Sequence, residues 1–471
     1  MKRSKRLFIL LGVFAVICVS TVVLMQTEEN KEKIKNSGEI VLEVSSDNVT
    51  SLSWEYGDTS LAFHKDDKWL YDEDEAFPVD EEKIHDLLEP FESFGVSFII
   101  EDVTDYGMYG LDEPICTIQF TADEQPYEIT LGDFSNMDSE RYVSIGDGNV
   151  YLAKKDPLDQ YDAVLKDMIK HDDDLAYDKI NQIKFEGAEE YSIFYDEESD
   201  ATYCADDVYF TERDGETLPL DTNLVGSYLE NLTTLNPINY VSYNVTDEEL
   251  ASYHLDNPEL TITVDYLYED DDKNEVSDTF VISVSRNPEK LAAAEEAEKN
   301  EEDPEKVTGY VRIGESQIIY EISESVCDSL FAASYDELRH RKVLTADFED
   351  IYQLDISLEG NNYTVLADKE DENERIWTYQ EEEIEITDIK TSLKNLSADN
   401  ADSFVVEDSS GTEEISLTVY LDNETYPSVK IELYRYDGTN CLAKVDGKTF
   451  ALIPRSDVVD LIEAVNSIVL N

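Results

Sequence analysis

A six-residue phrase that occurs twice is the feature that most constrains the fold of this chain. Tyr109 to Pro114 reads YGLDEP, and Tyr253 to Pro258 reads YHLDNP, 144 residues further along a chain of 471 residues. Tyr, Leu, Asp and Pro keep their places in both copies. A phrase repeated at this distance indicates that the chain is built from duplicated units, and its length is sufficient for about two to four domains.

The surroundings of the phrase extend the repeat to three copies, each containing an amphipathic helix. Asp80, Asp221 and Thr387 each follow an apolar stretch, and these residue types cap helix N-termini by accepting a backbone N–H bond. Apolar residues then recur at spacings of three and four, which predicts a helix of about three turns with one buried face. They are Ile84, Leu87, Leu88 and Phe91, then Val225, Leu229 and Leu232, then Ile389, Leu393 and Leu396.

Alternating apolar and polar residues predict strands on both sides of each helix. A hairpin-like pair precedes each helix, such as VTSLSWE and KWLYDE in the first copy, and three further stretches follow it. The last stretch of each copy is expected to be a hairpin, because turn sequences such as GDG stand between its arms. A second helix is predicted to close each copy, at residues 156–168, 323–333 and 456–468.

These patterns predict an α+β fold of three repeated modules, each an antiparallel sheet with packed helices. The expected modules cover residues 48–172, 178–338 and 346–468. The second contains an insertion at residues 291–306, which is rich in Ala, Glu and Lys and is expected to be an exposed helix or a mobile loop.

The hexapeptide itself is interpreted as a turn that starts the next strand. Proline biases the residue before it toward extended conformations, and the Asp side chains are expected to bond to their own backbone. The Leu residues are expected to point inward, with the Tyr rings beside them. A catalytic Tyr–Asp pair is the alternative, and it is disfavoured because the third module lacks the phrase. The residues concerned are Tyr109, Gly110, Leu111, Asp112 and Pro114, and Tyr253, Leu255, Asp256 and Pro258.

The N-terminus carries the pattern of a membrane anchor. A basic stub at residues 1–6 precedes an uncharged run at residues 7–25, and acidic residues follow in a linker at residues 26–47. A run of this length is close to the 20 or so residues that cross hydrocarbon, and the charge order places the N-terminus in the cytoplasm. We therefore expect an uncleaved signal anchor and a single-pass protein of the cell membrane, with the bulk of the chain outside. A cleaved signal peptide and a lipoprotein modified at Cys18 are the alternatives.

Composition excludes several classes of function. The formal net charge of -73, from 109 acidic and 36 basic residues, argues against nucleic-acid binding and favours a basic partner. The acidic runs at 172–174 and 269–272 are interpreted as solvated surface rather than calcium sites, since neither has EF-hand spacing. The five His and the widely spaced Cys residues follow no metal or catalytic pattern, so the Cys are expected to be unpaired thiols and neither a catalytic, cofactor nor metal site is predicted.

The order of these motifs resembles a bacterial family named only as domain of unknown function 4340. Its hallmarks are a Trp-containing strand, a Phe-Pro-Val-Asp helix start and a Tyr-Gly-Leu-Asp-x-Pro turn. The first module matches them at Trp69, at Phe77, Pro78 and Asp80, and at the first hexapeptide. The second matches more loosely, and the third keeps Trp377 but lacks the turn phrase.

The resemblance implies a modest functional expectation. Relatives are bacterial envelope proteins, membrane-anchored or secreted, without an established catalytic residue, and some resemble accessory parts of ABC transporters in their genomic setting. We therefore expect a noncatalytic binding or scaffold protein of the cell envelope, partnered by envelope or membrane proteins such as transporter subunits. The alternative is an extracytoplasmic enzyme or solute-binding protein that acts on cell-wall material.

Overall fold

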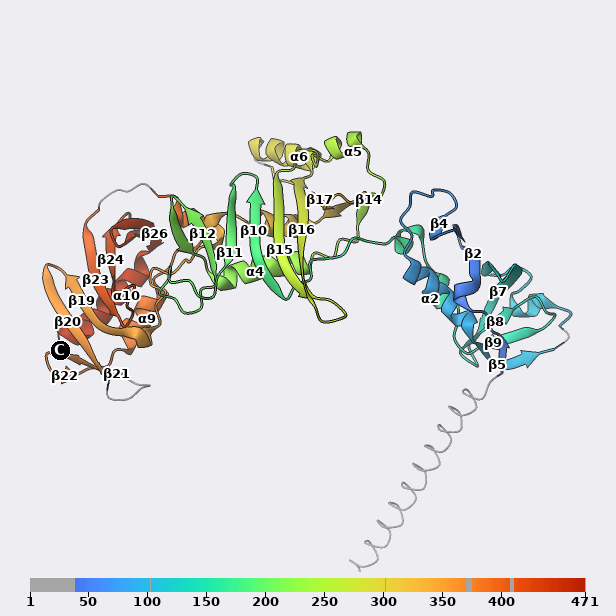
Figure 1. Cartoon of the computed structure of the whole chain (residues 1–471), viewed down its shortest axis with the longest axis horizontal. Coiled ribbons are helices and arrows are strands. Elements are labelled where there is room, and N and C mark those ends of the chain that lie inside the picture. Colours follow the sequence, from blue (N-terminus) through green and yellow to red (C-terminus); the bar gives the residue numbers. More distant parts are fainter. Residues whose placement is uncertain (1–38, 102, 301, 370–374, 407–410, 471) are drawn as a thin grey trace, which may run out of the picture. The chain divides into compact units, whose positions relative to one another are not determined.

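The computed structural model describes residues 39–101, 103–300, 302–369, 375–406 and 411–470. The chain divides into two compact units, Met1–His171 and Asp172–Asn471. The described part contains three antiparallel sheets, one in the first unit and two in the second (Figure 1).

The first unit is built on a nine-stranded sheet in the order β1-β5-β9-β8-β7-β6-β2-β3-β4. Its strands are β1 (Ile40–Leu42), β2 (Val49–Tyr56), β3 (Thr59–Lys65), β4 (Trp69–Tyr71), β5 (Phe94–Ile100), β6 (Cys116–Ala122), β7 (Gln125–Ser135), β8 (Glu140–Ser144) and β9 (Val150–Ala153). Its helices are α2 (Glu81–Glu92) and α3 (Leu158–Tyr161), with 3-10 turns at Ser46–Asn48, Tyr106–Tyr109 and Leu165–Met168.

The second unit begins with a nine-stranded sheet in the order β13-β12-β11-β10-β15-β16-β17-β18-β14. Its strands are β10 (Lys179–Glu186), β11 (Tyr191–Tyr195), β12 (Tyr209–Arg213), β13 (Glu216–Pro219), β14 (Tyr240–Ser242), β15 (Leu260–Glu269), β16 (Glu275–Arg286), β17 (Gly309–Ile313) and β18 (Ile319–Ile322). The accompanying helices are α4 (Thr222–Thr233), α5 (Asp247–Ser252), α6 (Pro288–Lys299), α7 (Glu324–Phe331) and α8 (Tyr335–Leu338).

The same unit contains an eight-stranded sheet in the order β22-β21-β20-β19-β23-β24-β25-β26. Its strands are β19 (Ile351–Leu358), β20 (Asn361–Lys369), β21 (Arg375–Tyr379), β22 (Glu382–Glu383), β23 (Glu413–Leu421), β24 (Ser428–Arg435), β25 (Asn440–Val445) and β26 (Lys448–Pro454). The helices α9 (Thr387–Asn395) and α10 (Arg455–Val469) pack with it, and 3-10 turns lie at Phe348–Asp350 and Ala401–Phe404.

The three sheets share one strand order. Seven consecutive strands correspond: the first sheet reads β4-β3-β2-β6-β7-β8-β9, the second β12-β11-β10-β15-β16-β17-β18, and the third β21-β20-β19-β23-β24-β25-β26. In each case the helix-containing connection links the first three strands to the last four. The repeated sequence pattern therefore corresponds to a repeated topology.

Each sheet has more strands in its first part than the sequence pattern predicts, including the short edge strands β13 and β22. The predicted hairpin-like pairs correspond to the first and third of three strands, and the middle strands β3, β11 and β20 were missed. These middle strands bury few side chains: Leu61 and Phe63 in β3, Ile193 in β11 and Val365 in β20. Because so few apolar positions carry it, the alternation is weak there.

The first two predicted helix caps are confirmed and the third is wrong. The Asp80 carboxylate accepts a hydrogen bond from the N–H of Glu82 at 3.0 Å, and Asp221 caps α4 through the N–H groups of Asn223 and Leu224. Thr387 is instead the first residue of α9, because Ile386 before it already has helical angles and occupies the cap position without a side-chain hydrogen bond.

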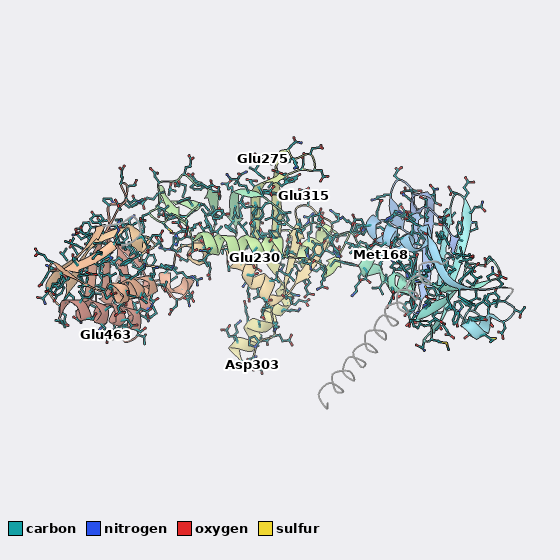
Figure 2. All side chains as sticks on the ribbon, turned by 90° about the horizontal axis from the view of Figure 1, so that it is seen from below. Met168, Glu230, Glu275, Asp303, Glu315 and Glu463 are labelled. Atoms are coloured by element: carbon teal, nitrogen blue, oxygen red, sulfur yellow. The ribbon has the colours of Figure 1, made fainter. Side chains whose placement is uncertain are left out.

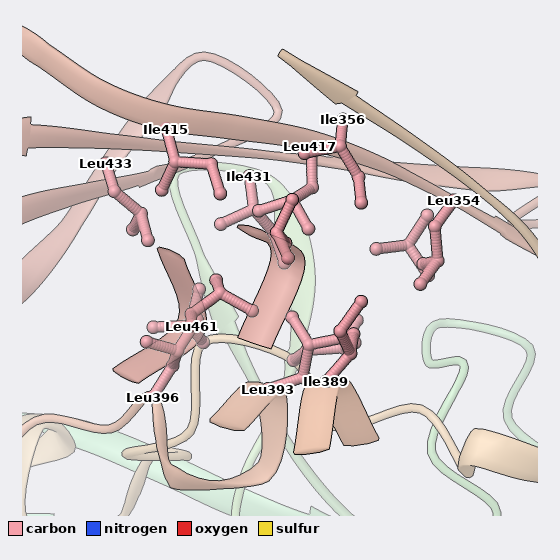
Figure 3. Packing of buried hydrophobic residues seen from close by; sticks show 14 of the residues in the cluster. Leu354, Ile356, Ile389, Leu393, Leu396, Ile415, Leu417, Ile431, Leu433 and Leu461 are labelled. Atoms are coloured by element: carbon pink, nitrogen blue, oxygen red, sulfur yellow. The ribbon is translucent and has the colours of Figure 1, made fainter. Parts of the chain in front are cut away.

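Each of the three repeated helices, α2, α4 and α9, buries an apolar stripe. In the third sheet, Ile389, Leu393 and Leu396 from the α9 segment and Leu461 from α10 face strand residues such as Leu354, Ile356, Ile415, Leu417, Ile431 and Leu433 (Figure 3). All these side chains are at most 2% exposed. Burial of this kind stabilises a fold by roughly 25 cal/mol per Å² of apolar surface. The contact therefore holds the helices in place against the sheet.

The closing helices agree with prediction in the second and third copies. Ser323 caps α7, and α10 covers Arg455–Val469. In the first copy the predicted helix at 156–168 is wrong: a short α3 and a 3-10 turn replace it, because Val164 between them has extended backbone angles. The insertion forms the exposed helix α6, which begins at Pro288 after an Asn287 cap and buries no residue (Figure 1).

Both hexapeptides form the same helix C-cap. Gly110 and His254 have positive φ angles of 68° and 56°, in the left-handed region. The N–H of Leu111 donates to the carbonyl of Tyr106 at 3.0 Å, and that of Leu255 donates to Leu250 at 2.8 Å. A left-handed residue followed by an apolar residue whose N–H bonds back across five residues is a Schellman motif. The predicted turn is confirmed, but its hydrogen bonds come from the backbone, and no bond of the Asp112 or Asp256 carboxylate to its own backbone occurs among the described residues.

The membrane prediction requires correction. The segment expected to cross the membrane, residues 7–25, lies outside the described residues. Within the described ranges, no helix is both long and apolar enough to span a membrane. A span needs about 20 predominantly apolar residues, whereas α10, the longest helix described, has 15 and carries charged side chains. The described fold therefore consists of antiparallel sheets and packed helices, and the predictions of a membrane-spanning helix and a single-pass membrane location are not retained.

Candidate functional site

A cavity of about 790 Å³ lies in the second unit, between the edges of its two sheets. One wall is the β12–β13 hairpin together with the loop that precedes β12, and the opposite wall is the β25–β26 hairpin. The segment that joins the two sheets lines the remainder. The lining residues fall within 201–203, 213–219, 335–345 and 445–450, with Tyr426 beside them.

The charge of this cavity differs from that of the rest of the chain. Its lining includes four Lys or Arg residues and three acidic residues, whereas the whole chain has about three acidic residues for each basic one. The basic residues are Arg213, Arg339, Lys342 and Lys448. An anionic group that enters the cavity therefore meets a higher proportion of basic side chains than the chain has on average.

Arg339 is held in place by aromatic rings. Its guanidinium lies 5.0 Å from the ring centre of Tyr335, 4.2 Å from that of Phe404 and 5.3 Å from that of Phe450. Stacking of this kind fixes the orientation of a guanidinium, and the Arg339 Nη1 also lies 3.4 Å from Asp336 Oδ1. A second guanidinium, that of Arg213, lies 4.5 Å from the Tyr335 ring centre and pairs with Glu189 at 2.5 Å.

Two lysines at the cavity differ in their partners. The Lys448 ammonium on β26 pairs with Glu216 on β13 at 2.8 Å, which links the two sheet edges. Both side chains are exposed, so water and salt screen the pair and it opens easily. Lys342 is exposed and makes no ion pair with any residue that the structure describes.

Cys204, Asp207 and His340 form a cluster beside this cavity. One potential ligand atom from each lies within 4.8 Å of the others. His340 Nε2 is 2.8 Å from Asp207 Oδ1, while Nδ1 is 3.6 Å from Asp221 Oδ2. Thr202 Oγ1 donates to Asp207 Oδ2 at 2.6 Å, so the buried carboxylate is bound at both oxygens.

The cluster shifts the pKa values of its members in the directions that burial and charge dictate. Burial disfavours the imidazolium of His340, but hydrogen bonds from it to Asp207 and Asp221 prevail and raise its pKa to about 9. The same His340 lowers the pKa of Asp221. Desolvation raises the pKa of the Cys204 thiol to about 11, so the thiol is protonated near neutral pH.

The cysteines agree with the prediction of unpaired thiols, and carboxylates of both acidic runs accept backbone hydrogen bonds. All four cysteines within the described residues are free, and Cys116, Cys327 and Cys441 are buried. In the run at 269–272 the Asp270 carboxylate accepts N–H bonds from Asp272 and Asn274, which closes a local turn. In the run at 172–174, Asp174 accepts the N–H of Asn236.

The family model for DUF4340, a domain of unknown function, matches residues 69–214 and 213–418. The chain belongs to the DUF4340 family. The resemblance seen in the sequence is thereby confirmed. No curated protein and no solved structure matches the chain. The DUF4340 description itself assigns no ligand or activity to the cavity.

The residues that identify the DUF4340 pattern lie in cores and turns. Trp69 and Trp377 are 5% and 4% exposed, and Phe77 and the two hexapeptide leucines are also buried. The Tyr109 ring contacts Tyr142 on β8, and the Tyr253 ring contacts Tyr310 on β17, the equivalent strand of the second sheet. Pro78 accepts a backbone bond from Lys170, and Pro114 and Pro258 are partly buried.

Only Asp221 among the predicted motif residues adjoins the candidate site. It caps α4 and also faces His340. The cavity and the cluster were not predicted, because Cys204 and His340 are 136 residues apart and the two sheet edges meet only in the folded unit. The local signal is limited to the Cys-x-x-Asp spacing of Cys204 and Asp207, which by itself predicts nothing.

Proposed function

We propose that this DUF4340 chain is a noncatalytic binding protein that takes up an extended, acidic segment of a partner protein in the cavity between β13 and β26. The observation that carries the proposal is the position of a cation-rich hollow between two sheet edges. An extended acidic segment has carboxylates that can pair with the basic side chains, and it has backbone groups that can pair with an edge strand.

The sheet edges support an extended ligand. β13 is the outermost strand of the second sheet and β26 is the outermost strand of the third, and both line the cavity. An edge strand presents backbone N–H and C=O groups that a further strand can pair with, which is a recurrent way of binding peptides. Thr217 on β13 and Thr449 on β26 mark the two edges in the lining.

The cationic lining supports an acidic ligand. A carboxylate that enters can replace Glu216 at Lys448, bind the free ammonium of Lys342, or pair with the N–H edges of the stacked Arg339. Hydrogen bonds between charged groups of this kind are shorter and stronger than bonds between neutral groups. The surrounding surface repels anions, so an acidic segment is favoured at the cavity and disfavoured elsewhere.

The exterior separately favours a partner with a basic face. Exposed acids such as Glu230, Glu275, Glu315 and Glu463 carry much of the charge (Figure 2). Attraction between such a surface and a basic partner speeds association and weakens as salt rises. A partner protein of the cell envelope, including a transporter subunit, stays a prediction.

Site-specific photo-crosslinking in cells tests the proposal. A photoreactive residue at Thr217 or Thr449 is expected to capture the same acidic segment, whereas one at Glu382 on the opposite edge strand β22 serves as the control. The double variant Lys342→Glu with Lys448→Glu should reduce capture at least tenfold. The equal charge change Lys179→Glu with Lys184→Glu on β10, where neither residue lines the cavity, should leave it unchanged.

The outcomes distinguish the proposal from its alternative. Equal capture at the cavity positions and at Glu382 would exclude a segment bound between the edges. A small anionic solute that occupies the cavity and is chemically converted would instead favour the alternative of an enzyme or solute-binding protein. In that case loss of turnover on substitution of one lining carboxylate or His, with the fold retained, would identify the reactive group.

A further inference from the structure

The second unit places a sulfur, an oxygen and a nitrogen donor together in a way that no part of the proposed binding function uses. Cys204 and Asp207 lie on the loop between β11 and β12, and His340 follows α8. Thiolate, carboxylate and imidazole are the three side-chain types that bind zinc in proteins. We propose that Cys204, Asp207 and His340 form a binding site for one zinc ion.

The geometry requires only small movements. Zinc bonds of about 2.0–2.3 Å in a tetrahedron place neighbouring ligand atoms about 3.3–3.7 Å apart. In the structure the nearest pair, His340 Nε2 and Asp207 Oδ1, is 2.8 Å apart, and all three ligand atoms lie within 4.8 Å. Rotation of the partly exposed Cys204 side chain and a small shift of the imidazole would bring the three atoms around one ion.

The groups around the cluster already orient the ligands. Thr202 holds the second oxygen of Asp207, which leaves Oδ1 toward the imidazole. Asp221 lies 3.6 Å from His340 Nδ1, on the side away from Asp207. In zinc sites the second nitrogen of a ligating His usually donates to a carboxylate, which fixes the tautomer and the direction of the other nitrogen. Asp221 is a positioning residue of this kind.

The cluster is also accessible. His340 and Thr202 line the 790 Å³ cavity, so an ion can enter and a water molecule can complete the coordination. The inference does not depend on the acidic-segment proposal, since the ion requires only the three side chains and solvent.

Zinc titration of the chelator-treated full chain tests the site. We expect one tight site per chain by calorimetry, and with cobalt as a probe we expect the thiolate charge-transfer absorption that carboxylates alone do not give. Cys204→Ser, Asp207→Asn and His340→Gln should each weaken binding at least 100-fold and Cys204→Ser should abolish the charge-transfer band. Asp221→Asn keeps a helix-capping residue and should weaken binding about 10–100-fold.

A measurement on the unsubstituted chain guards against variants that fail to fold. Zinc should slow alkylation of Cys204 at least tenfold, as read from its peptide by mass spectrometry, without changing the modification of the buried Cys116, Cys327 and Cys441. His254→Gly, which removes an exposed imidazole in the same unit, should bind zinc normally. Zinc bound by surface acids alone would leave Cys204 alkylation and the cobalt spectrum unaffected, and that result would overturn the proposal.

Discussion

At the scale of single residues, the two hexapeptides place different residue types in the same left-handed backbone conformation. The first copy uses Gly110 in the left-handed region, where glycine has no steric penalty, and the second uses His254, where a side chain costs about 1 kcal/mol. In both copies the left-handed residue is followed by a buried leucine, Leu111 or Leu255. The sequence predicted a turn here because Leu, Asp and Pro recur, but it did not distinguish an Asp-based turn from a backbone cap.

This difference predicts opposite effects of two substitutions. His254→Gly should raise the free energy of unfolding of the second unit by about 0.5–1 kcal/mol, because it removes left-handed strain. Gly110→Ala should lower that of the first unit by more than about 1–2 kcal/mol, since an added Cβ would also lie 2.9 Å from the backbone nitrogen of Asp133. Urea unfolding followed by hydrogen exchange measures both.

Gly146→Ala is the matched control for the second change. Gly146 also has a positive φ, 79°, but nothing lies within 4 Å of an added Cβ. It should therefore show the cost of strain without the cost of crowding. A loss at Gly110 no larger than the loss at Gly146 would contradict the close approach of the Asp133 backbone.

At the scale of elements, nearly identical sequences take different structures. SFIIED at 97–102 contributes to β5, which pairs with β9. SFVVED at 403–408 instead begins within the 3-10 turn Ala401–Phe404. Phe404 there packs edge-on against Phe450 and under the Arg339 guanidinium. Contacts with residues distant in the sequence thus determine the conformation of this segment. Its own amino-acid sequence was therefore not sufficient to predict it.

The elements that could be predicted are those whose own sequence contains the signal for a strand, a turn or a helix cap. The strands next to each helix, the hairpins at β8–β9, β17–β18 and β25–β26, and the caps at Asp80 and Asp221 follow from alternation, turn residues and capping chemistry. The cavity and the metal-ligand cluster depend on how the edge of one sheet meets the edge of the next. Neither leaves a periodic signal in the sequence.

A carboxylate that joins three elements gives a prediction for pH. Glu414 on β23, 8% exposed, accepts bonds from Arg435 on β24 at 2.6 Å and from Arg455 on α10 at 3.0 Å. Burial acts to raise its pKa, but the two guanidinium groups prevail and lower it below the usual 4.5. A lowered pKa means that the stabilisation is present above pH 4.5 and is lost as the pH falls through the pKa of the folded state.

Glu414→Gln should therefore lower the free energy of unfolding of the second unit by about 1–3 kcal/mol at pH 7. The difference from the unsubstituted chain should shrink as the pH falls below 4.5. Glu463→Gln, an exposed position on α10, is the control and should have little effect at any pH. A Glu414→Gln difference that is independent of pH would show that packing, not charge, stabilises this junction.

At the scale of the whole molecule, charge and repetition are the dominant features. A net charge of -73 places many exposed acids close together, and their mutual repulsion destabilises the compact state. The repetition is seen in the strand order that the three sheets share. The two DUF4340 segments meet at residues 213–214, in the turn between β12 and β13, whereas the chain divides into compact units after His171. The family match and the compact units therefore divide the repeat at different points.

The charge predicts an unusual response to salt. Between about 10 mM and 150 mM salt the Debye length falls from about 30 Å to about 8 Å, which screens repulsion between acids that are not in direct contact. We expect the free energy of unfolding to rise by about 1 kcal/mol or more, measured as a thermal shift of about 2–4 °C. Sodium and potassium chloride should act equally. A stability that is unchanged or lower at the higher salt concentration would show that local ion pairs outweigh the repulsion.

The pairing of Asp80 with Met168 has a consequence for synthesis. The N–H of Asp80 donates to the carbonyl of Met168 at 2.8 Å, and Val79 forms a bridge with Ile169. The start of α2 is thus held by a segment that a ribosome makes almost ninety residues later. A nascent chain with all nine strands already outside the exit tunnel would still lack this contact. The first unit is therefore completed only once residue 170 emerges, and a fragment cut after β9 would leave the backbone groups of Pro78, Val79 and Asp80 without these partners.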